Sequence, residues 1–145
     1  KNENIDIIST TKLALEIFNE QNIIFQSKLG SLNVKIDRTN LIRVITNLIK
    51  NAIQATENIK DSKIIVSVKK LRNKAIIEIE DNGDGIPRKN RDKIFEPKFT
   101  TKSKGMGLGL SIIKNLVTNY NGKIDFVSKK GKTIFKIELP IHKNV

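Results

Sequence analysis

Hydrophobic residues along the chain follow two different periods, and the longer period predicts helices. Between residues 37 and 57 the apolar positions lie three or four residues apart, which predicts one long helix with Asp37 as its N-cap. A second run with this spacing covers about residues 107–120. A shorter helix is predicted to follow a hydroxyl cap at Ser9 or Thr10.

Alternation of apolar and polar residues predicts strands in most of the remaining chain. The predicted strands cover residues 5–8, 22–29, 32–36, 63–71, 74–80, 123–128 and 132–139. A turn at Gly30-Ser31 separates the second and third strands, and tight turns join the later ones, which should be antiparallel. We expect a single α+β domain over residues 1–145. It should be a two-layer α/β sandwich, in which three helices cover one face of a mixed sheet of about five strands.

The rare residue types exclude several classes of site. The chain has no cysteine, which excludes disulfides, Cys-ligated zinc and thiol catalysis. Its one histidine, His142, excludes His-based zinc sites and argues against a Ser-His-Asp triad. No apolar run approaches the roughly 20 residues that cross a bilayer, and the polar first residues are unlike a signal peptide. Because the chain begins with Lys1 and not with methionine, we expect it to be a piece of a longer protein.

A net charge of +12 raises the question of a nucleic-acid partner. The chain has 22 Lys, 25 Ile and 16 Asn, a bias that an AT-rich coding sequence produces without selection for any partner. Proteins that bind single strands by stacking also need aromatic residues beside the basic ones, and this chain has six Phe, one Tyr and no Trp. We therefore expect no nucleic-acid partner.

Two carboxamides occupy one face of the long predicted helix. Asn47 and Asn51 are four residues apart, and Lys50 and Gln54 lie close to the same face, opposite the apolar stripe. A carboxamide oxygen is a hard neutral ligand that suits Mg²⁺ when the ion keeps its other bonds to phosphate and water. The alternative is a solvated polar face that is rich in Asn through composition alone.

A loop of acidic residues and glycines follows the predicted strand at residues 74–80. An aspartate at the end of a buried strand, as Asp81 would be, is costly unless it meets a partner. Gly83 and Gly85 permit positive φ and let a ligand approach the backbone closely. A surface turn is the alternative. An EF-hand calcium loop is excluded, because glycine occupies its third position and Asp92 its twelfth.

The stretch between residues 81 and 105 follows neither period, and long loops of this kind are often functional. Residues 87–105 contain seven basic and two acidic side chains, which suits a polyanionic ligand. A solvated linker is the alternative, but Phe95 and Phe99 favour docking of this segment against the rest of the domain.

Three glycines, Gly105, Gly107 and Gly109, lead into the last predicted helix. Glycines at a helix N-terminus expose backbone N–H groups to an anion, and the helix dipole favours negative charge there. Their spacing is GxGxG with no preceding strand, which excludes a Rossmann fingerprint. The sequence Gly131-Lys132-Thr133 looks like the end of a P-loop, but Phe126 stands where the first glycine of that motif would be, which excludes it. The protein-kinase signatures are also missing.

In this order and context, the four clusters resemble the catalytic and ATP-binding domain of bacterial sensor histidine kinases, within the Bergerat-fold ATPase superfamily. The segments that resemble the N box, the first G box, the F box and the second G box are residues 47–52, 81–87, 94–102 and 105–110. Residues 131–140 are similar to the family's last strand. The first three boxes resemble the nitrogen-regulation branch, whose F box commonly ends in Thr-Thr-Lys.

The resemblance implies roles for individual residues. Asp81 should accept a hydrogen bond from the adenine amine. Guanine would present a carbonyl oxygen to this acceptor, so the site should reject guanine. Asn51 should coordinate Mg²⁺ and act with Asn47 and Lys102 in catalysis. The residues implied to bind the nucleotide are Asn47, Asn51, Gln54, Asp81, Gly83, Gly85, Ile86, Thr101, Lys102, Gly105, Gly107, Leu108, Gly109 and Thr133. Many relatives have Lys or Arg at the position of Gln54, which leaves basic residues elsewhere to meet the phosphate charge.

The implied reaction is transfer of the γ-phosphoryl group of ATP to a histidine on a separate dimerisation domain, with a response regulator downstream. We expect no acceptor within this chain, because His142 lies in the C-terminal tail and the family's acceptor lies on an N-terminal helical hairpin. The domain should be monomeric and cytoplasmic, and its parent kinase a homodimer with or without an inner-membrane anchor. The alternatives are a nucleotide-operated switch and an anti-sigma-factor-type serine kinase on the same fold. Asn47 stands where hydrolytic relatives place a glutamate, which argues against the switch.

Overall fold

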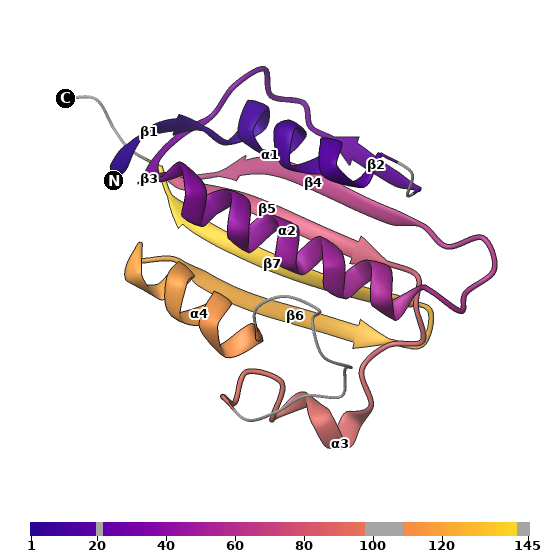
Figure 1. Ribbon diagram of the computed structural model, residues 1–145. Coiled ribbons are helices and arrows are strands. Elements are labelled where there is room, and N and C mark those ends of the chain that lie inside the picture. The colour runs from indigo at the N-terminus through magenta and orange to yellow at the C-terminus, as the bar shows by residue number, and fades with distance from the viewer. Residues whose placement is uncertain (20–21, 98–108, 142–145) are drawn as a thin grey trace.

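The computed structural model describes residues 1–19, 22–97 and 109–141, in which helices are interspersed among strands (Figure 1). The helices are α1 (Ile7–Leu15), α2 (Arg38–Ala55), α3 (Arg88–Arg91) and α4 (Leu110–Asn119), with a 3₁₀ turn at Glu16–Phe18. The strands are β1 (Asn2–Asp6), β2 (Ile23–Gln26), β3 (Asn33–Asp37), β4 (Ile64–Leu71), β5 (Lys74–Asp81), β6 (Lys123–Lys129) and β7 (Lys132–Pro140). The prediction of the long helix, its Asp37 cap and the last four strands is confirmed.

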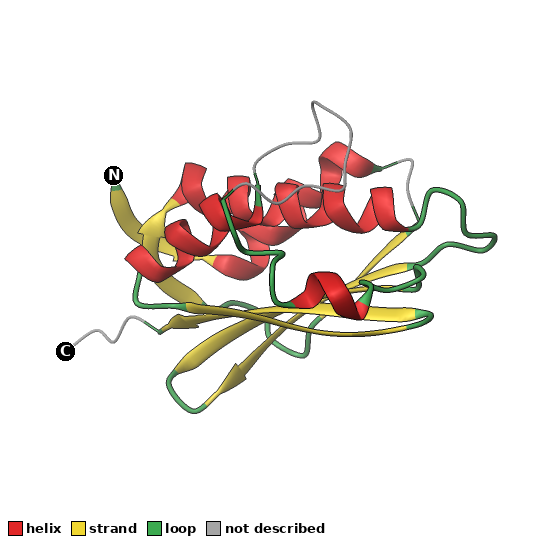
Figure 2. Ribbon diagram, turned by 90° about the horizontal axis from the view of Figure 1, so that it is seen from below, coloured by secondary structure: helices red, strands yellow, loops and turns green. Residues whose placement is uncertain are grey.

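Five strands form the main sheet in the order β2-β4-β5-β7-β6. Strand β2 is parallel to β4 and the other neighbouring pairs are antiparallel, so the sheet is mixed. Strands β1 and β3 form a separate antiparallel pair. Helices α1, α2 and α4 lie over one face of the five-stranded sheet (Figures 1 and 2). The predicted two-layer α+β architecture is therefore confirmed.

Branched aliphatic side chains fill the layer between the helices and the sheet. Helix α2 contributes Ile45 and Leu48, while β5 and β7 contribute Ile77, Ile79 and Ile137, and each of these side chains is 1% exposed or less. Burying one such side chain contributes about 1.5–3 kcal/mol. This packing holds α2 across β5, with the carboxyl ends of both elements on the same side of the domain (Figure 1).

The start of α1 differs from the prediction. Its N-cap is Asp6, so the caps predicted at Ser9 or Thr10 are wrong, and the second half of the first predicted strand is helical instead. Asp6 Oδ1 accepts hydrogen bonds from Ile8 N at 3.1 Å and from Leu32 N at 2.9 Å. The carboxylate therefore joins the helix to a segment that is distant in the sequence, a constraint that local patterns do not carry.

The strands on either side of Gly30-Ser31 are present, but they do not pair with each other. Strand β2 lies parallel to β4, with Ile23 opposite Ile64, whereas β3 pairs with β1. A parallel pair needs a long crossover between its strands, here the segment that contains α2. Turn chemistry cannot reveal such a pairing, because the turn it marks does not connect the paired strands.

Removing the charge of Asp6 should change how stability depends on pH. Partial burial raises the pKa of this carboxyl, but hydrogen bonds from Leu32, Ile8 and Ser9 outweigh that effect, so the pKa lies below the ordinary value of 3.8. A carboxyl with a lowered pKa stabilises the fold fully above its ordinary value, and this stabilisation is lost as the pH falls through the lowered value. Asp6→Asn should therefore flatten the loss of unfolding free energy below about pH 4. Urea unfolding at several pH values measures this, with the exposed Glu3→Gln as control; identical slopes for the two variants would contradict it.

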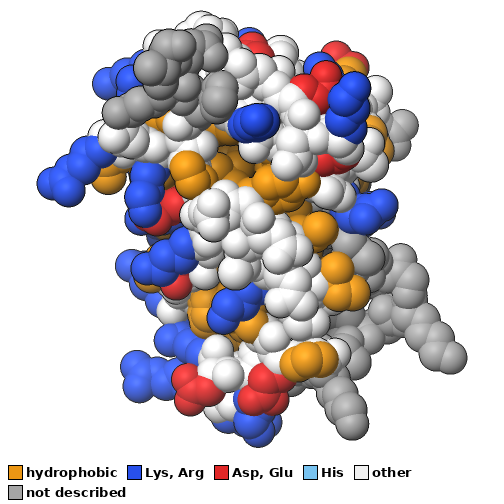
Figure 3. All heavy atoms as spheres, turned by 90° about the vertical axis from the view of Figure 1, so that its left-hand side faces the viewer, with side chains coloured by type: hydrophobic (Ala, Val, Ile, Leu, Met, Phe, Trp, Pro, Cys, Tyr) orange, Lys and Arg blue, Asp and Glu red, His pale blue; other side chains and the backbone are white. Residues whose placement is uncertain are grey.

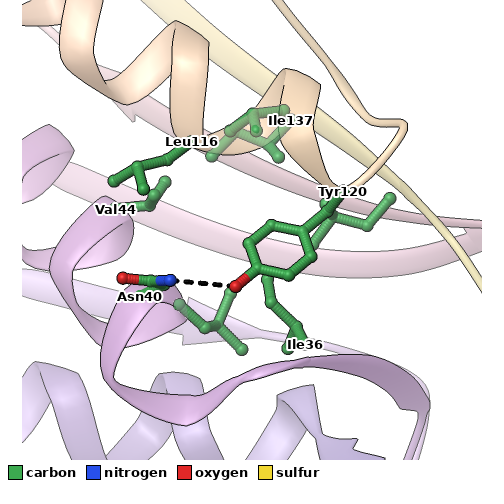
Figure 4. Close-up of a pocket in the computed structure, with 9 residues that line it drawn as sticks. Ile36, Asn40, Val44, Leu116, Tyr120 and Ile137 are labelled. Atoms are coloured by element: carbon green, nitrogen blue, oxygen red, sulfur yellow. Dashed lines mark hydrogen bonds between the residues drawn. The ribbon is translucent and has the colours of Figure 1, made fainter. Parts of the chain in front are cut away.

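A small cavity lies between α2 and α4 (Figure 4). Its lining residues are Ile36, Asn40, Leu41, Val44, Leu116, Val117, Tyr120, Ile137 and Leu139. Its volume of about 10 Å³ is at the lower limit for one water molecule, and most of the lining is aliphatic. It is therefore an irregularity of packing and not a ligand site.

The hydroxyl of Tyr120 closes one side of this cavity. It accepts hydrogen bonds from Asn40 Nδ2 at 2.9 Å (Figure 4) and from Asp37 N at 3.4 Å. Tyr120→Phe should lower the free energy of unfolding by about 1 kcal/mol, because these part-buried donors lose their acceptor. Urea unfolding measures the change, and Asn40→Ala provides the second side of a double-mutant cycle. Additive effects of the two changes would contradict the contact.

Charges are mixed on the face of the molecule that lies near both termini. Figure 3 shows Lys and Arg side chains standing singly around this face, with acidic and apolar side chains among them. One ion pair, between the start of β5 and the end of β7, joins Lys74 Nζ to Glu138 Oε2 at 3.6 Å. Among the described residues visible on this face, the positive charge does not gather in one patch. Within the described part of the chain, no helix has the length and apolarity that crossing a membrane requires.

Candidate functional site

Strand β5 ends in a buried carboxylate. Asp81 is 4% exposed, and it is the only buried acidic residue in the described part of the chain. Its Oδ1 accepts a hydrogen bond from Gly83 N at 2.9 Å. On the neighbouring strand β7, Thr133 lies opposite Asp81 and is also 4% exposed. Burying a charge costs several kcal/mol unless polar partners surround it, so this row of polar groups marks a specialised position of the sheet.

The loop after Asp81 is held by close backbone contacts. A Cβ on Gly83 would lie 2.5 Å from the carbonyl oxygen of Ala55, the last residue of α2. Gly85 has a φ of +89°, and a Cβ there would lie 2.6 Å from the carbonyl oxygen of Lys129. Gly85 therefore uses the positive φ that glycine permits, whereas Gly83 is needed for close packing against α2.

Ser128, which no sequence motif marks, completes this end of the site. Ile86 N donates to Ser128 Oγ at 2.8 Å, and Ser128 Oγ lies 2.7 Å from Thr133 Oγ1. The predicted residues Gly83, Gly85, Ile86 and Thr133 thus come together around Asp81. Ser128 carried no signal because a serine near a strand end is common, and only the pairing of β6 with β7 reveals its neighbours.

The carboxamides of α2 differ in their exposure to solvent. Asn47 is 6% exposed and its Nδ2 donates to Arg43 O at 2.7 Å, which makes Oδ1 the acceptor at the other end of the amide. Asn51 and Gln54 are half-buried, and Gln54 Oε1 is buried without a hydrogen-bond partner among the described residues. The alternative of a polar face due to composition alone is therefore wrong for Asn47.

The donor set limits what a metal could do here. Within residues 1–19, 22–97 and 109–141 there is no group of three or more His, Cys, Asp or Glu side chains that could hold an ion. Neutral carboxamides are weak ligands by themselves, so an ion at this helix would depend on a ligand that brings its own anionic oxygens. This chemistry fits Mg²⁺, which usually keeps several waters and binds through phosphate.

Half of the predicted basic loop is packed against the domain. It contains the short helix α3, which is too brief to produce a visible period, and Ile94, which is 4% exposed. The ring of Phe95 lies 6.0 Å from that of Phe126, and Lys114 Nζ lies 5.2 Å from the Phe95 centroid. Docking of Phe95 is therefore confirmed.

Several predicted residues fall where the structure makes no statement. Phe99, Thr101, Lys102, Gly105, Gly107, Leu108 and His142 lie outside the described residues. Gly109 is described: it is the N-cap of α4, with φ −66° and ψ 156°. A Cβ at Gly109 would meet only Ser111 Oγ, at 3.9 Å, so no described atom requires glycine there.

Comparisons with known proteins agree with this arrangement. A family model described as histidine kinase-, DNA gyrase B-, and HSP90-like ATPase matches residues 36–143. The sensory histidine kinase/phosphatase NtrB of Escherichia coli O157:H7 is 37% identical over 117 residues, which are 74% of this chain and 33% of that protein. NtrB of Azospirillum brasilense is 34% identical over 119 residues, 72% of this chain and 30% of that protein. This chain spans about a third of the length of these curated relatives.

Solved structures show the same architecture. The catalytic domain of histidine kinase ThkA, in a nucleotide-free form, is 32% identical with a TM-score of 0.87, over 97% of this chain and 96% of that chain. Histidine kinase ThkA in complex with response regulator protein TrrA is 27% identical with a TM-score of 0.83, over 97% of this chain and 42% of that one. The similarity thus extends over nearly the entire chain.

Proposed function

Since the chain belongs to the family of histidine kinase-, DNA gyrase B- and HSP90-like ATPases, we propose that it is the ATP-binding catalytic domain of a sensor histidine kinase. The resemblance to sensor histidine kinases inferred from the four boxes is confirmed by the NtrB and ThkA matches. ATP binding follows from the family. The identity of the kinase substrate, the use of Mg²⁺ and the roles of individual residues are our proposals.

The buried carboxylate of Asp81 is the observation that carries the base end of the proposal. A carboxylate accepts several hydrogen bonds and donates none, so beyond the bond from Gly83 N it can accept one from the exocyclic amine of adenine. Guanine would place a carbonyl oxygen against it. The close packing of Gly83 and Gly85 would keep the loop backbone beside the base, and Ile86 would contact the base from the same loop.

Helix α2 supplies the phosphate end. Asn51 would coordinate Mg²⁺ through its carboxamide oxygen, and Asn47 would assist at the phosphates. When bound, Mg²⁺ would neutralise phosphate charge that develops during transfer. The buried oxygen of Gln54 suits a donor that arrives with the ligand, such as a water molecule or a ribose hydroxyl. Thr101, Lys102 and the backbone of Gly105, Gly107, Leu108 and Gly109 remain predicted contacts of the triphosphate.

The proposed reaction moves the γ-phosphoryl group from ATP to an imidazole nitrogen. The P–O bond to the β-phosphate breaks, a P–N bond forms, and ADP leaves. The acceptor histidine would belong to the dimerisation domain of the parent kinase, at the cytoplasmic side, and a response regulator would take the group next. Positioning and charge stabilisation supply most of the catalysis in phosphoryl transfer, and α2 and the loop after β5 offer both.

Phosphotransfer to a separate acceptor tests the proposal. The 145-residue chain is incubated with γ-labelled ATP, Mg²⁺ and the dimerisation domain of its parent kinase. We expect label on that domain that is lost in acid, as phosphohistidine is, and none when Asn51→Ala replaces the native chain. Acid-stable label would indicate serine phosphorylation, and rapid ADP release without labelling would indicate a nucleotide-operated switch; either result would contradict the kinase proposal.

A further inference from the structure

The hairpin of β6 and β7 holds the loop that follows β5. Gly131 N, at the turn of the hairpin, donates to Gly83 O at 2.9 Å. Farther along the loop, Ile86 N donates to Ser128 Oγ at 2.8 Å. The hairpin therefore anchors both ends of residues 83–86, which form the base side of the proposed site.

Ser128 also belongs to a row of polar side chains that crosses the sheet. It lies opposite Thr133, and Thr133 lies opposite Asp81, all on the face that the helices cover. The Ser128 and Thr133 hydroxyl oxygens are 2.7 Å apart. This row ends at Asp81, the proposed contact of the adenine base. The direction of the hydrogen bonds along the row therefore decides which groups are donors and which are acceptors beside that base.

The hydrogen bond between the two hydroxyls can run in either direction, and a ligand beside Asp81 favours one of them. Ser128 Oγ already accepts the bond from Ile86 N. If Thr133 also donated to Ser128, the Ser128 proton would have no acceptor among the described residues. If Ser128 donates to Thr133, the proton without a described acceptor is instead that of Thr133, which lies opposite Asp81 and can be taken by a bound base or a water molecule. Hydrogen bonds linked in this way also polarise one another.

We propose that Ser128 is a positioning residue for base recognition, which it serves by fixing the loop and by making the Thr133 hydroxyl a donor. This inference rests on the proposed ATP site. Adenine presents an amine donor flanked by two ring nitrogens that accept, N1 and N7. Asp81 as acceptor and Thr133 as donor, directly or through one water, complement such a pair. Guanine presents a carbonyl to Asp81, and on the N1 side it also presents an N1–H donor to Thr133, so both contacts would be mismatched there, whereas its N7 still accepts. Ser128 thereby acts on specificity without touching the base.

Nucleotide titrations of a Ser128 series test the inference. Isothermal titration compares ATP with 1-deaza-ATP and 7-deaza-ATP, each of which lacks one ring nitrogen beside the amine. Ser128→Ala should weaken ATP binding by about 5- to 20-fold. It should also lower, by about threefold or more, the preference for ATP over whichever deaza analogue the native chain binds less tightly. Ser128→Thr keeps a hydroxyl and should restore both values. Ser67→Ala, on the open face of β4, is the matched control and should change neither.

The outcomes separate this inference from the proposed function. ATP affinity at the native level in Ser128→Ala, or weaker binding with an unchanged preference ratio, would overturn the inference. If Ser128→Ala does not fold, Ser128→Cys keeps the size of the side chain with much weaker hydrogen bonding, and the same loss of preference is expected. Failure of the unmodified chain to bind any of the three nucleotides would instead contradict the proposed ATP site.

Discussion

Replacing Asp81 by asparagine should weaken ATP binding by about 5- to 150-fold, which corresponds to about 1–3 kcal/mol. Gly83 N donates to Oδ1 of the native side chain, so the asparagine oxygen will take that position and its Nδ2 will occupy the other. The amide nitrogen then faces the adenine amine, and two donors meet. The fixed loop prevents the amide from avoiding this by rotating, because rotation would leave Gly83 N without its acceptor.

Isothermal titration with ATP and GTP measures the effect of Asp81→Asn. The preference for ATP over GTP should fall together with the affinity, because an amide nitrogen tolerates the guanine carbonyl that a carboxylate rejects. Asp84→Asn is the matched control, since Asp84 is exposed in the same loop and the substitution removes the same charge. Unchanged ATP affinity and unchanged rejection of GTP would remove Asp81 from the base site.

Gly85→Ala should destabilise both the fold and the nucleotide complex. A residue with a Cβ pays about 1–2 kcal/mol for the left-handed conformation that Gly85 adopts at φ +89°. Its Cβ would also lie 2.6 Å from the Lys129 carbonyl oxygen, and that backbone is fixed in the β6–β7 hairpin. We expect a loss of about 2–4 kcal/mol in unfolding free energy and ATP binding weaker by about tenfold or more, since the loop must move away from the base.

A second glycine offers the control for Gly85→Ala. Gly131 has nearly the same conformation, with φ +85°, but no described atom lies within 4 Å of its added Cβ. Gly131→Ala should therefore be destabilised by the conformational cost alone. Urea unfolding of the two variants isolates the contact with Lys129, and equal losses would show that this contact is unimportant.

Residue type and local order predicted much of this molecule. The period of α2 and its Asp37 cap, the last four strands and the polar groups at Asn47 and Asp81 all carry their signals within a few neighbouring residues. These signals are local because helix caps, alternation and turns involve short stretches of chain.

The missed features depend on distant contacts. The Asp6 cap is shared with Leu32 N, and β2 pairs in parallel with β4, from which it is separated in sequence by a segment that contains α2. The role of Gly83 depends on the end of α2, and Ser128 becomes part of the site only through the pairing of β6 with β7. Each of these features depends on contacts that exist only once the chain has folded.

The position of β5 in the sheet has a thermodynamic consequence. This strand is third of five and is bonded to β4 on one side and β7 on the other over its full length. Amides of such a strand exchange with solvent only in large openings of the structure, so Asp81 stays in place before any ligand arrives. Capture of the base should then cost little ordering entropy. The enthalpy that the base contributes to binding should be nearly the same for adenosine as for ATP. The difference in binding enthalpy between these two ligands then reports on the phosphate end alone.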